Sequence, residues 1–400
     1  MKKFLLLIFL VTTSIFGQRI PESIQTKNLG TRTFTVVTPA SYDSNPEKSY
    51  PTLILLDGEY LVDPFEGVLK YGSYWDDLPE FIIIAIDQNN GDTRFADSEF
   101  DEAGFPSGAG ANFFEFIGIE LLPYVEKKYR TLPFRIIAGH DTTAGFLNFY
   151  LYKDNPIFNA YISLAPEMAP EMEKRIAERL AKITKPLFYY LGTGEADLIE
   201  INEKAAELDA NIKAVPNASF KYQSDAFKGA SHYSLVAKAI PNAVYFIFDG
   251  YQPISMVEFK DKILKLDSGY TDYLIIKYNE LEKKFGFKIK PRLSDFKAIE
   301  AAILKNKAYN ELLPLSDYAN KQYPKTTLGT YHEALYYEKT GNYKKAIKSY
   351  QKAFTQEAIR ELTKDFMLNR AEALKGKEDK PTEEIPVEVP INDTPTEKTE

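Results

Sequence analysis

Residues 135–146 read RIIAGHDTTAGF and decide the fold class of this 400-residue chain. A short apolar run leads into Gly139, His140 and Asp141, and an amphipathic segment then continues to Tyr150. A buried strand that passes through a sharp turn into a helix is typical of parallel α/β folds. In such folds the loops at the carboxyl ends of the strands bind the ligand. The segment therefore predicts an α/β protein with a functional turn at Asp141.

Short apolar runs alternate with longer amphipathic segments on both sides of this turn, from about Thr31 to Tyr251. Several runs are continuously apolar, as in EFIIIAID at residues 80–87, which suits strands buried on both faces of a parallel sheet. Helical periodicity separates them at Ala111–Tyr129 and Glu171–Lys182. The pattern predicts an α/β sandwich with a mostly parallel central sheet. The expected strands are Thr33–Thr38, Thr52–Leu56, Phe81–Ile86, Phe134–Ala138, Ala160–Leu164, Leu187–Leu191 and Ser219–Gln223.

The composition excludes several classes of protein. With 44% hydrophobic and 26% charged residues, the chain can bury a sizeable core. The net charge of −8 argues against nucleic-acid binding, which needs a basic surface. The absence of cysteine excludes disulfides, thiolate zinc sites, a cysteine nucleophile and the acylated cysteine of a lipoprotein. With only three histidines, we do not expect a multi-histidine metal centre. No motif of the sequence indicates a cofactor, and none is expected.

The first eighteen residues have the pattern of a secretory signal peptide. Two lysines precede an apolar run at Phe4–Val11, and small and polar residues follow as far as Gly17. An N-terminal membrane anchor is the alternative, but this run is too short to cross about 30 Å of hydrocarbon. We therefore expect an exported protein, periplasmic or secreted, with no membrane span after removal of the signal.

From about Ser255 the strand pattern disappears and helical spacing takes its place. Tyr343, Ala346, Tyr350 and Ala353 share one helical face in TGNYKKAIKSYQKAF, and a degenerate copy lies 34 residues earlier. This segment resembles the tetratricopeptide repeat, in which small residues let antiparallel helices approach closely. The resemblance implies a surface for a protein partner, whereas a plain helical hairpin is the alternative. A capping helix is expected at Glu357–Leu374.

The end of the chain, after Gly376, carries eight acidic residues, three lysines and four prolines. Such a segment buries too little apolar surface to fold, so we expect a disordered acidic tail. The predicted organisation is a signal peptide at 1–18, an α/β domain at 19–254, a helical connector at 255–289, a small all-α helical-repeat domain at 290–375 and the tail at 376–400.

Further motifs flank the turn in a characteristic order. They are LLDGEY at 55–60, PEFIIIAID at 79–87, ELLPYVEKKYRT at 120–131, GASHYSLV at 229–236 and FIFDGY at 246–251. Over residues 31–251 the chain resembles the esterase D and enterochelin-esterase family of α/β-hydrolases. The resemblance implies the α/β-hydrolase fold and the hydrolysis of carboxylic esters, including siderophore-type esters, by a Ser–His–acid triad.

The elbow of that family usually reads G-H-S-x-G-G, and this chain departs from it twice. Asp141 occupies the nucleophile position of the serine, and Thr143 occupies the position of a glycine. Neighbours two residues from the nucleophile are normally small, which Gly139 satisfies and the β-branched Thr143 does not. The two departures predict that ester hydrolysis is impaired.

The resemblance also places the remaining groups of the site. His232 matches the catalytic histidine, and its acid partner is expected after the strand at residues 187–191, where Glu195 and Asp197 are candidates and Glu195 is preferred. Either acid could instead cap the following helix. The oxyanion hole is expected from the backbone amides of Gly58, Glu59 and Thr142.

Three functions remain open on these observations. The first is a carboxylic-ester hydrolase with reduced activity. The second is a non-catalytic pseudo-esterase that binds a small ester or siderophore-like ligand, or a protein through its helical repeats. The third is a hydrolase with an Asp nucleophile, because GHD also occurs in haloalkane dehalogenases and epoxide hydrolases. The acidic stretch Asp87–Glu102 lacks the glycine and glutamate of a calcium loop, and we interpret it as a solvated loop at the rim of the site.

Overall fold

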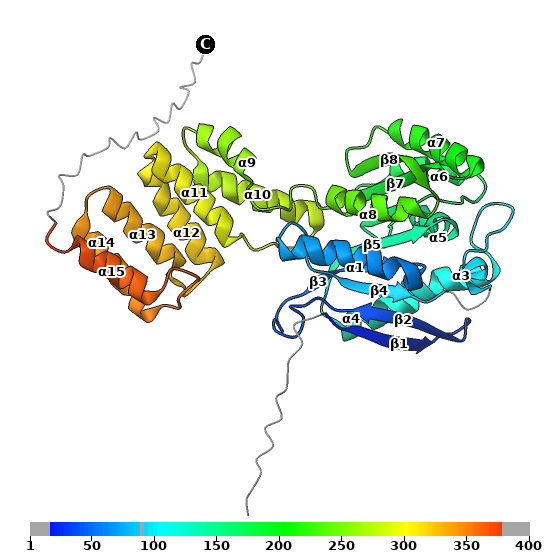
Figure 1. Ribbon diagram of the computed structural model, residues 1–400, viewed down its shortest axis with the longest axis horizontal. Coiled ribbons are helices and arrows are strands. Elements are labelled where there is room, and N and C mark those ends of the chain that lie inside the picture. Colours follow the sequence, from blue (N-terminus) through cyan, green and yellow to red (C-terminus); the bar gives the residue numbers. More distant parts are fainter. Residues whose placement is uncertain (1–16, 89–91, 378–400) are drawn as a thin grey trace, which may run out of the picture. The chain divides into compact units, whose positions relative to one another are not determined.

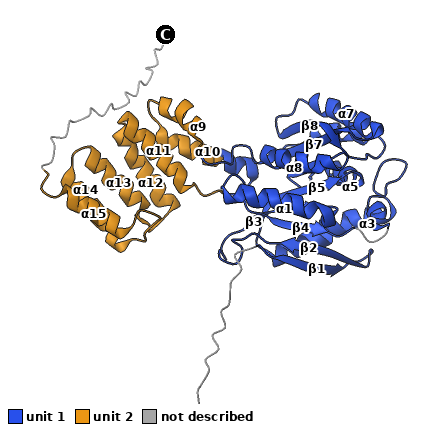
Figure 2. Cartoon of the chain, in the orientation of Figure 1, with its two compact units in different colours: residues 1–253, 280–288 blue, residues 254–279, 289–400 orange. Residues whose placement is uncertain are grey.

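The computed structural model describes residues 17–88 and 92–377. The chain forms two compact units, which Figure 2 shows in different colours: unit 1 comprises residues 1–253 and 280–288, and unit 2 comprises residues 254–279 and 289–400. Nearly all of the expected signal peptide and of the acidic tail lies outside the described residues. None of the described helices is long and apolar enough to cross a membrane.

Unit 1 is built on an eight-stranded sheet with the order β1-β2-β4-β3-β5-β6-β7-β8 (Figure 1). Strand β2 pairs antiparallel with β1 and β4, and all the other neighbours are parallel. The mostly parallel α/β-hydrolase sheet predicted from the sequence is confirmed. The strands are β1 (Arg19–Gln25), β2 (Thr31–Val37), β3 (Tyr50–Leu55), β4 (Ile82–Ile86), β5 (Thr131–His140), β6 (Ala160–Leu164), β7 (Leu187–Ala196) and β8 (Phe220–Ser231).

The central strands form because their side chains are apolar on both faces. Every residue of β3, β4 and β6 is buried, as the continuous apolar runs predicted. Strand β1 was not predicted. It is an edge strand of sequence RIPESIQ in which exposed and half-buried residues alternate, so it carries no apolar run.

Helices cover both faces of this sheet. On one face α3, α4, α6 and α7 pack with the strands into one apolar cluster, and α1 and α8 contact each other on the other face (Figure 1). The single helix expected at Ala111–Tyr129 is interrupted by a π-helical turn at Phe116–Leu121, next to Pro123, which lacks an N–H donor. The helices are α1 (Gly58–Tyr74), α2 (Thr93–Asp97), α3 (Gly108–Glu115), α4 (Leu122–Lys128), α5 (Thr142–Phe146), α6 (Met172–Leu180), α7 (Ile199–Lys213) and α8 (Ser234–Ile247).

Unit 2 consists of helices, and each of α12 to α14 contacts the helix that follows it. Small side chains lie at these contacts, since Ala334, Ala346, Ala353 and Ala371 are all buried in one apolar cluster. Its helices are α9 (Met256–Asp261), α10 (Tyr270–Phe285), whose end belongs to unit 1, α11 (Leu293–Asn306), α12 (Leu312–Gln322), α13 (Thr327–Lys339), α14 (Tyr343–Lys352) and α15 (Lys364–Leu374).

The expected capping helix is shorter than predicted. It begins at Lys364 and not at Glu357, because the Thr363 side chain caps it by accepting a hydrogen bond from the Phe366 amide. The preceding residues form isolated bridges, Thr326 with Glu357 and Ile359 with Leu362. The tetratricopeptide register of this unit stays a prediction.

Candidate functional site

The turn between β5 and α5 holds Asp141 in a conformation that few non-glycine residues adopt. Its φ is 62° and its ψ is −123°. A strained backbone of this kind costs about 1–3 kcal/mol and persists only where its surroundings enforce it. The Asp141 N–H donates to the carbonyl of Leu164, and the Asp141 carbonyl accepts from the amides of Gly145 and Glu167. These bonds hold the Asp141 side chain at the carboxyl edge of the sheet.

The structure overturns the steric expectation at Thr143. Its side chain is fully buried, and its φ is not among the positive values. The Thr143 hydroxyl donates to Asp57 Oδ2 at 2.6 Å and accepts from the amide of His140 at 3.0 Å. The position that has no room for a side chain is Gly139, where a Cβ would lie 2.8 Å from the backbone carbonyl carbon of Thr143. The elbow therefore accommodates the β-branched residue.

His232 lies directly after β8 and faces two carboxylates. Its Nδ1 is 2.8 Å from Asp197 Oδ1, and its Nε2 is 3.9 Å from Asp141 Oδ1. Asp197 is thus the acid that holds the imidazole, and the preference for Glu195 is corrected. Strand β7 runs through Ala196, so Glu195 is still a strand residue, and its carboxylate accepts from the Gly229 amide at 2.7 Å.

Arg94, which was not predicted from the sequence, bridges two acids of the site. Its Nε lies 2.6 Å and its Nη2 3.2 Å from the Asp57 carboxylate, while its Nη1 lies 3.3 Å from Asp141 Oδ2. Its Nη2 also donates to the carbonyl of His140 at 2.9 Å. Arg94 lies on α2, within the acidic stretch that we interpreted as a solvated loop. It is the single basic residue of that stretch, and this was the signal that could have revealed it.

Asp57 is the buried acid on which this network converges. It precedes α1 with a left-handed backbone, and its carboxylate also accepts from the Tyr60 hydroxyl at 2.9 Å. Burial disfavours the positive charge of Arg94 and lowers its pKa. The hydrogen bonds to Asp57 and the negative charge of Asp57 outweigh burial, so the pKa of Arg94 is raised. Burial and the same acid raise the pKa of Tyr60. The guanidinium and the phenol therefore keep their protons at neutral pH.

The backbone groups expected in the oxyanion hole lie at two helix starts. Gly58 and Glu59 begin α1, Thr142 begins α5, and amides in the first turn of a helix have no acceptor within the helix. The bond between Thr143 and Asp57 ties these two helix starts together. A Cβ on Gly58 would lie 2.6 Å from the backbone of Ala85, so glycine is required there.

His140 lies between the backbone of His232 and the Tyr60 side chain. It is buried, its Nε2 lies 3.0 Å from the carbonyl of His232, and its Nδ1 lies 3.2 Å from the Tyr60 hydroxyl. Burial, together with the charge of His232, lowers the pKa of His140. A neutral imidazole that donates from Nε2 to this carbonyl fixes the backbone that carries His232.

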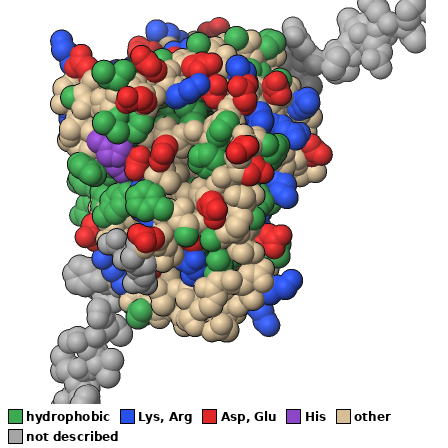
Figure 3. All heavy atoms as spheres, turned by 90° about the vertical axis from the view of Figure 1, so that its right-hand side faces the viewer, with side chains coloured by type: hydrophobic (Ala, Val, Ile, Leu, Met, Phe, Trp, Pro, Cys, Tyr) green, Lys and Arg blue, Asp and Glu red, His purple; other side chains and the backbone are tan. Residues whose placement is uncertain are grey.

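Exposed apolar side chains surround these polar groups. Phe95, Leu198 and Tyr233 are each more than 60% exposed, and each follows a site residue directly in the chain. Figure 3 shows a face of the molecule on which hydrophobic side chains gather beside a histidine side chain. Within residues 17–88 and 92–377, no three His, Asp or Glu side chains gather to hold a metal ion.

Comparisons with known proteins agree with this architecture. The model of a family described as "Putative esterase" matches residues 27–239. An uncharacterised protein from Capnocytophaga ochracea is 30% identical, with a TM-score of 0.79 over 89% of this chain and 99% of that one. No curated protein matches the chain significantly.

Two further solved structures share the fold. An IroE-like serine hydrolase from Shewanella oneidensis is 19% identical, with a TM-score of 0.57 over 80% of this chain and 99% of that one. The BES protein from Bacillus cereus is also 19% identical, with a TM-score of 0.50 over 61% and 98% of the two chains. At these identities the likeness concerns the fold alone.

Proposed function

The chain belongs to the esterase family, and we propose that it is an exported esterase-like protein in which the hydrolysis of carboxylic esters is strongly impaired. The site keeps the parts that orient an ester and lacks a competent nucleophile. Asp141 stands where the family carries its serine, and siderophore-type esters are among the ligands that the family resemblance implies.

The ion pair between Arg94 and Asp141 carries this proposal. In a serine hydrolase the histidine accepts the proton of the attacking hydroxyl, and the nucleophile lies within hydrogen-bond reach of it. Here Asp141 has no hydroxyl, it lies 3.9 Å from His232, and its carboxylate faces a guanidinium at 3.3 Å. A carboxylate that attacked an acyl carbon would form an anhydride, which readily reverses.

The threonines of the elbow do not replace the missing serine. The Thr142 hydroxyl donates to Glu167 at 2.8 Å, and the hydroxyl of Thr143 is buried against Asp57. Neither occupies the strained position at the apex of the turn, which belongs to Asp141. In contrast, His232 Nδ1 lies within hydrogen-bond distance of Asp197 Oδ1, at 2.8 Å.

Two alternatives follow from the same site. A hydrolase with an Asp nucleophile would attack saturated carbon through Asp141 and use His232 to activate water. The Arg94 ion pair weakens that nucleophile and counts against this mechanism. A pseudo-esterase that only binds is the other alternative, and the helical unit offers it a surface for a protein partner.

Hydrolysis of short acyl p-nitrophenyl esters tests the proposal. We expect the wild type to be inactive, and Asp141→Ser to introduce turnover that Asp141→Ser/His232→Gln abolishes. Asp141→Ser/Thr143→Gly restores the family elbow more fully, although it removes the hydroxyl that contacts Asp57. Wild-type turnover that disappears in both Asp141→Ala and His232→Ala would overturn the proposal and make Asp141 a working nucleophile.

Export is tested separately on the intact cell. We expect the N-terminus of the recovered protein to lie near Gly17 or Gln18, at the end of the predicted signal peptide. Mass spectrometry of the protein from the periplasmic and medium fractions measures this. Recovery of the uncleaved chain from the cytoplasm alone would contradict export.

A further inference from the structure

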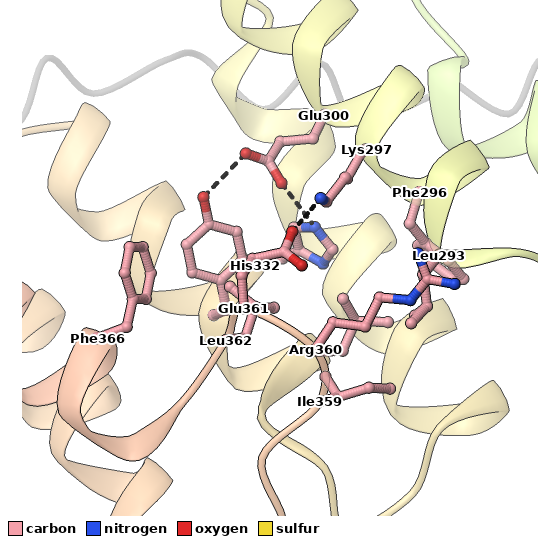
Figure 4. Close-up of a pocket in the computed structure, with 12 residues that line it drawn as sticks. Leu293, Phe296, Lys297, Glu300, His332, Ile359, Arg360, Glu361, Leu362 and Phe366 are labelled. Carbon is pink, nitrogen blue, oxygen red and sulfur yellow. Dashed lines mark hydrogen bonds and ion pairs between the residues drawn. The ribbon is translucent and has the colours of Figure 1, made fainter.

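Unit 2 contains a cavity that the esterase-like site does not use. Its volume is about 220 Å³, and it lies between α11, α13, the segment that precedes α15, and α15 itself (Figure 4). Its apolar walls are formed by Leu293, Phe296, Leu328, Ile359, Leu362 and Phe366. Walls of this kind accept aliphatic side chains.

The acidic groups of the cavity are already paired. Glu300 accepts hydrogen bonds from the Tyr331 hydroxyl at 2.9 Å and from His332 Nε2 at 3.2 Å. Glu361 forms an ion pair with Lys297, and Figure 4 shows these three contacts as dashed lines. These pairs leave no carboxylate in the cavity that needs a cationic ligand.

Two nitrogen groups of the cavity lining have no hydrogen-bond partner among the described residues. His332 is 1% exposed, and its Nδ1 has no hydrogen-bond partner among the described residues. Because Nε2 donates to Glu300, a neutral His332 offers Nδ1 as an acceptor for an N–H. Among the described residues the Arg360 guanidinium has no hydrogen-bond or ion-pair partner, although its charge acts on the neighbouring Glu361. Its backbone is left-handed, with a φ of 48°. The cavity therefore suits a ligand with a carboxylate, an N–H donor and aliphatic groups.

The C-terminal tail of this chain has these three features. Residues 383–391 read EEIPVEVPI, with Ile385, Val387, Val389 and Ile391 at every second position and no basic residue. Side chains two residues apart point to the same side of an extended peptide. A tail that serves only for solvation has no need of four aliphatic residues in this alternation.

The tail also begins within reach of the cavity. The described chain ends at Lys377, just after α15, and Phe366 on α15 is part of the cavity wall. The eleven residues of α15 span about 16 Å at 1.5 Å per residue. The eight residue-to-residue steps from Lys377 to Ile385 span up to about 27 Å when extended.

We propose that residues 383–391 of the tail dock in the cavity of unit 2 of the same molecule. The aliphatic side chains lie against the apolar walls, a glutamate of the segment pairs with Arg360, and a backbone N–H donates to His332 Nδ1. Val387, Glu388 and Val389 carry such an N–H, whereas Pro386 and Pro390 do not.

The test measures binding of a fluorescein-labelled peptide of sequence EEIPVEVPI by fluorescence anisotropy. One receptor is the full chain with Ile385→Ser, Val387→Ser, Val389→Ser and Ile391→Ser, which leaves the cavity open. The other is the wild type, whose own tail competes at an effective concentration on the order of 1 mM. We expect the wild type to bind the peptide at least tenfold more weakly than the open receptor.

Charge reversal identifies the site. Arg360→Glu in the open receptor should weaken peptide binding at least tenfold, while Lys348→Glu, at an exposed position of α14 outside the cavity, should leave it unchanged. Circular dichroism melting checks that both variants are folded. Absence of peptide binding to the open receptor, or equal binding to both receptors, would overturn the proposal. Association of the wild type that depends on concentration and on the four aliphatic residues would show docking between copies and would also overturn it.

Discussion

The guanidinium of Arg94 lies 3.3 Å from the carboxylate of Asp141, the residue that we propose stands in place of the family's serine. Arg94 is itself held by Asp57 through two of its nitrogens. Asp141 is thus part of a connected charge network. A serine at position 141 would remove the ion pair with Arg94 and leave the contacts between Arg94 and Asp57 unchanged.

Arg94→Gln is expected to destabilise the protein by about 3 kcal/mol, because it leaves the charge of Asp57 buried without its cation. Asp57 is 1% exposed and retains only hydrogen bonds from neutral donors such as Tyr60 and Thr143. Urea unfolding monitored by circular dichroism measures the loss. Arg94→Gln/Asp57→Asn should recover part of the stability, and a double variant no more stable than the single one would contradict this explanation.

Thr143→Val should cost about 1–3 kcal/mol, the penalty for buried polar groups that lose their partner. The two side chains have the same shape, but valine cannot donate to Asp57 Oδ2 or accept from the His140 amide. Thr143→Ser keeps the hydroxyl and is the matched control. Equal unfolding midpoints for wild type and Thr143→Val would mean that the hydroxyl only fills space.

Asp197→Asn should reduce the turnover of Asp141→Ser by about 10⁴-fold, since the acid fixes the tautomer and orientation of the histidine. The 2.8 Å contact between Asp197 Oδ1 and His232 Nδ1 is the reason. Glu195→Gln keeps an acceptor for the Gly229 amide and should change the rate little. A larger loss in Glu195→Gln than in Asp197→Asn would reverse the assignment of the acid.

The fold was predictable wherever burial on both faces makes a strand apolar throughout. Strand β6 has the expected bounds, Ala160–Leu164, because all five residues are buried. Strand β1 could not be found in this way, since it pairs only with β2 and alternates in exposure. A local run of apolar residues identifies strands that are buried in the core. An edge strand buries few side chains, so its sequence lacks such a run.

The site was predictable where chain order alone brings groups to one edge of the sheet. Asp141 and His232 each follow a strand directly, so their approach depends only on the topology. Arg94 is 47 residues from Asp141 and reaches it through the packing of α2, which no local pattern reports. The choice between Glu195 and Asp197 depends on where β7 ends, and the apolar run had placed that end five residues too early, at Leu191.

Lowering the pH below about 6.5 should remove stability that the wild type owes to His140. Burial and the charge of His232 lower the pKa of His140 below its ordinary value of 6.5, so folding favours the neutral imidazole. This contribution is fully present above pH 6.5 and is lost as the pH falls through the folded-state pKa. Urea unfolding of the wild type and of His140→Gln between pH 7.5 and 5 measures it, and the wild type should lose more stability over this range.

The comparison with His140→Gln is needed because another buried group acts in the opposite direction. Burial, opposed by the charge of Arg32, raises the pKa of Asp97 to about 6. A raised pKa gives stability that is present at low pH and is lost as the pH rises through 6, so Asp97 partly masks the effect of His140 in the wild type. Asp97 is the same in both proteins and cancels in their difference. If the difference in unfolding free energy between the two proteins stays constant from pH 7.5 to 5, unfolding does not change the protonation of His140. The assignment of a neutral imidazole that donates to the His232 carbonyl would then be wrong.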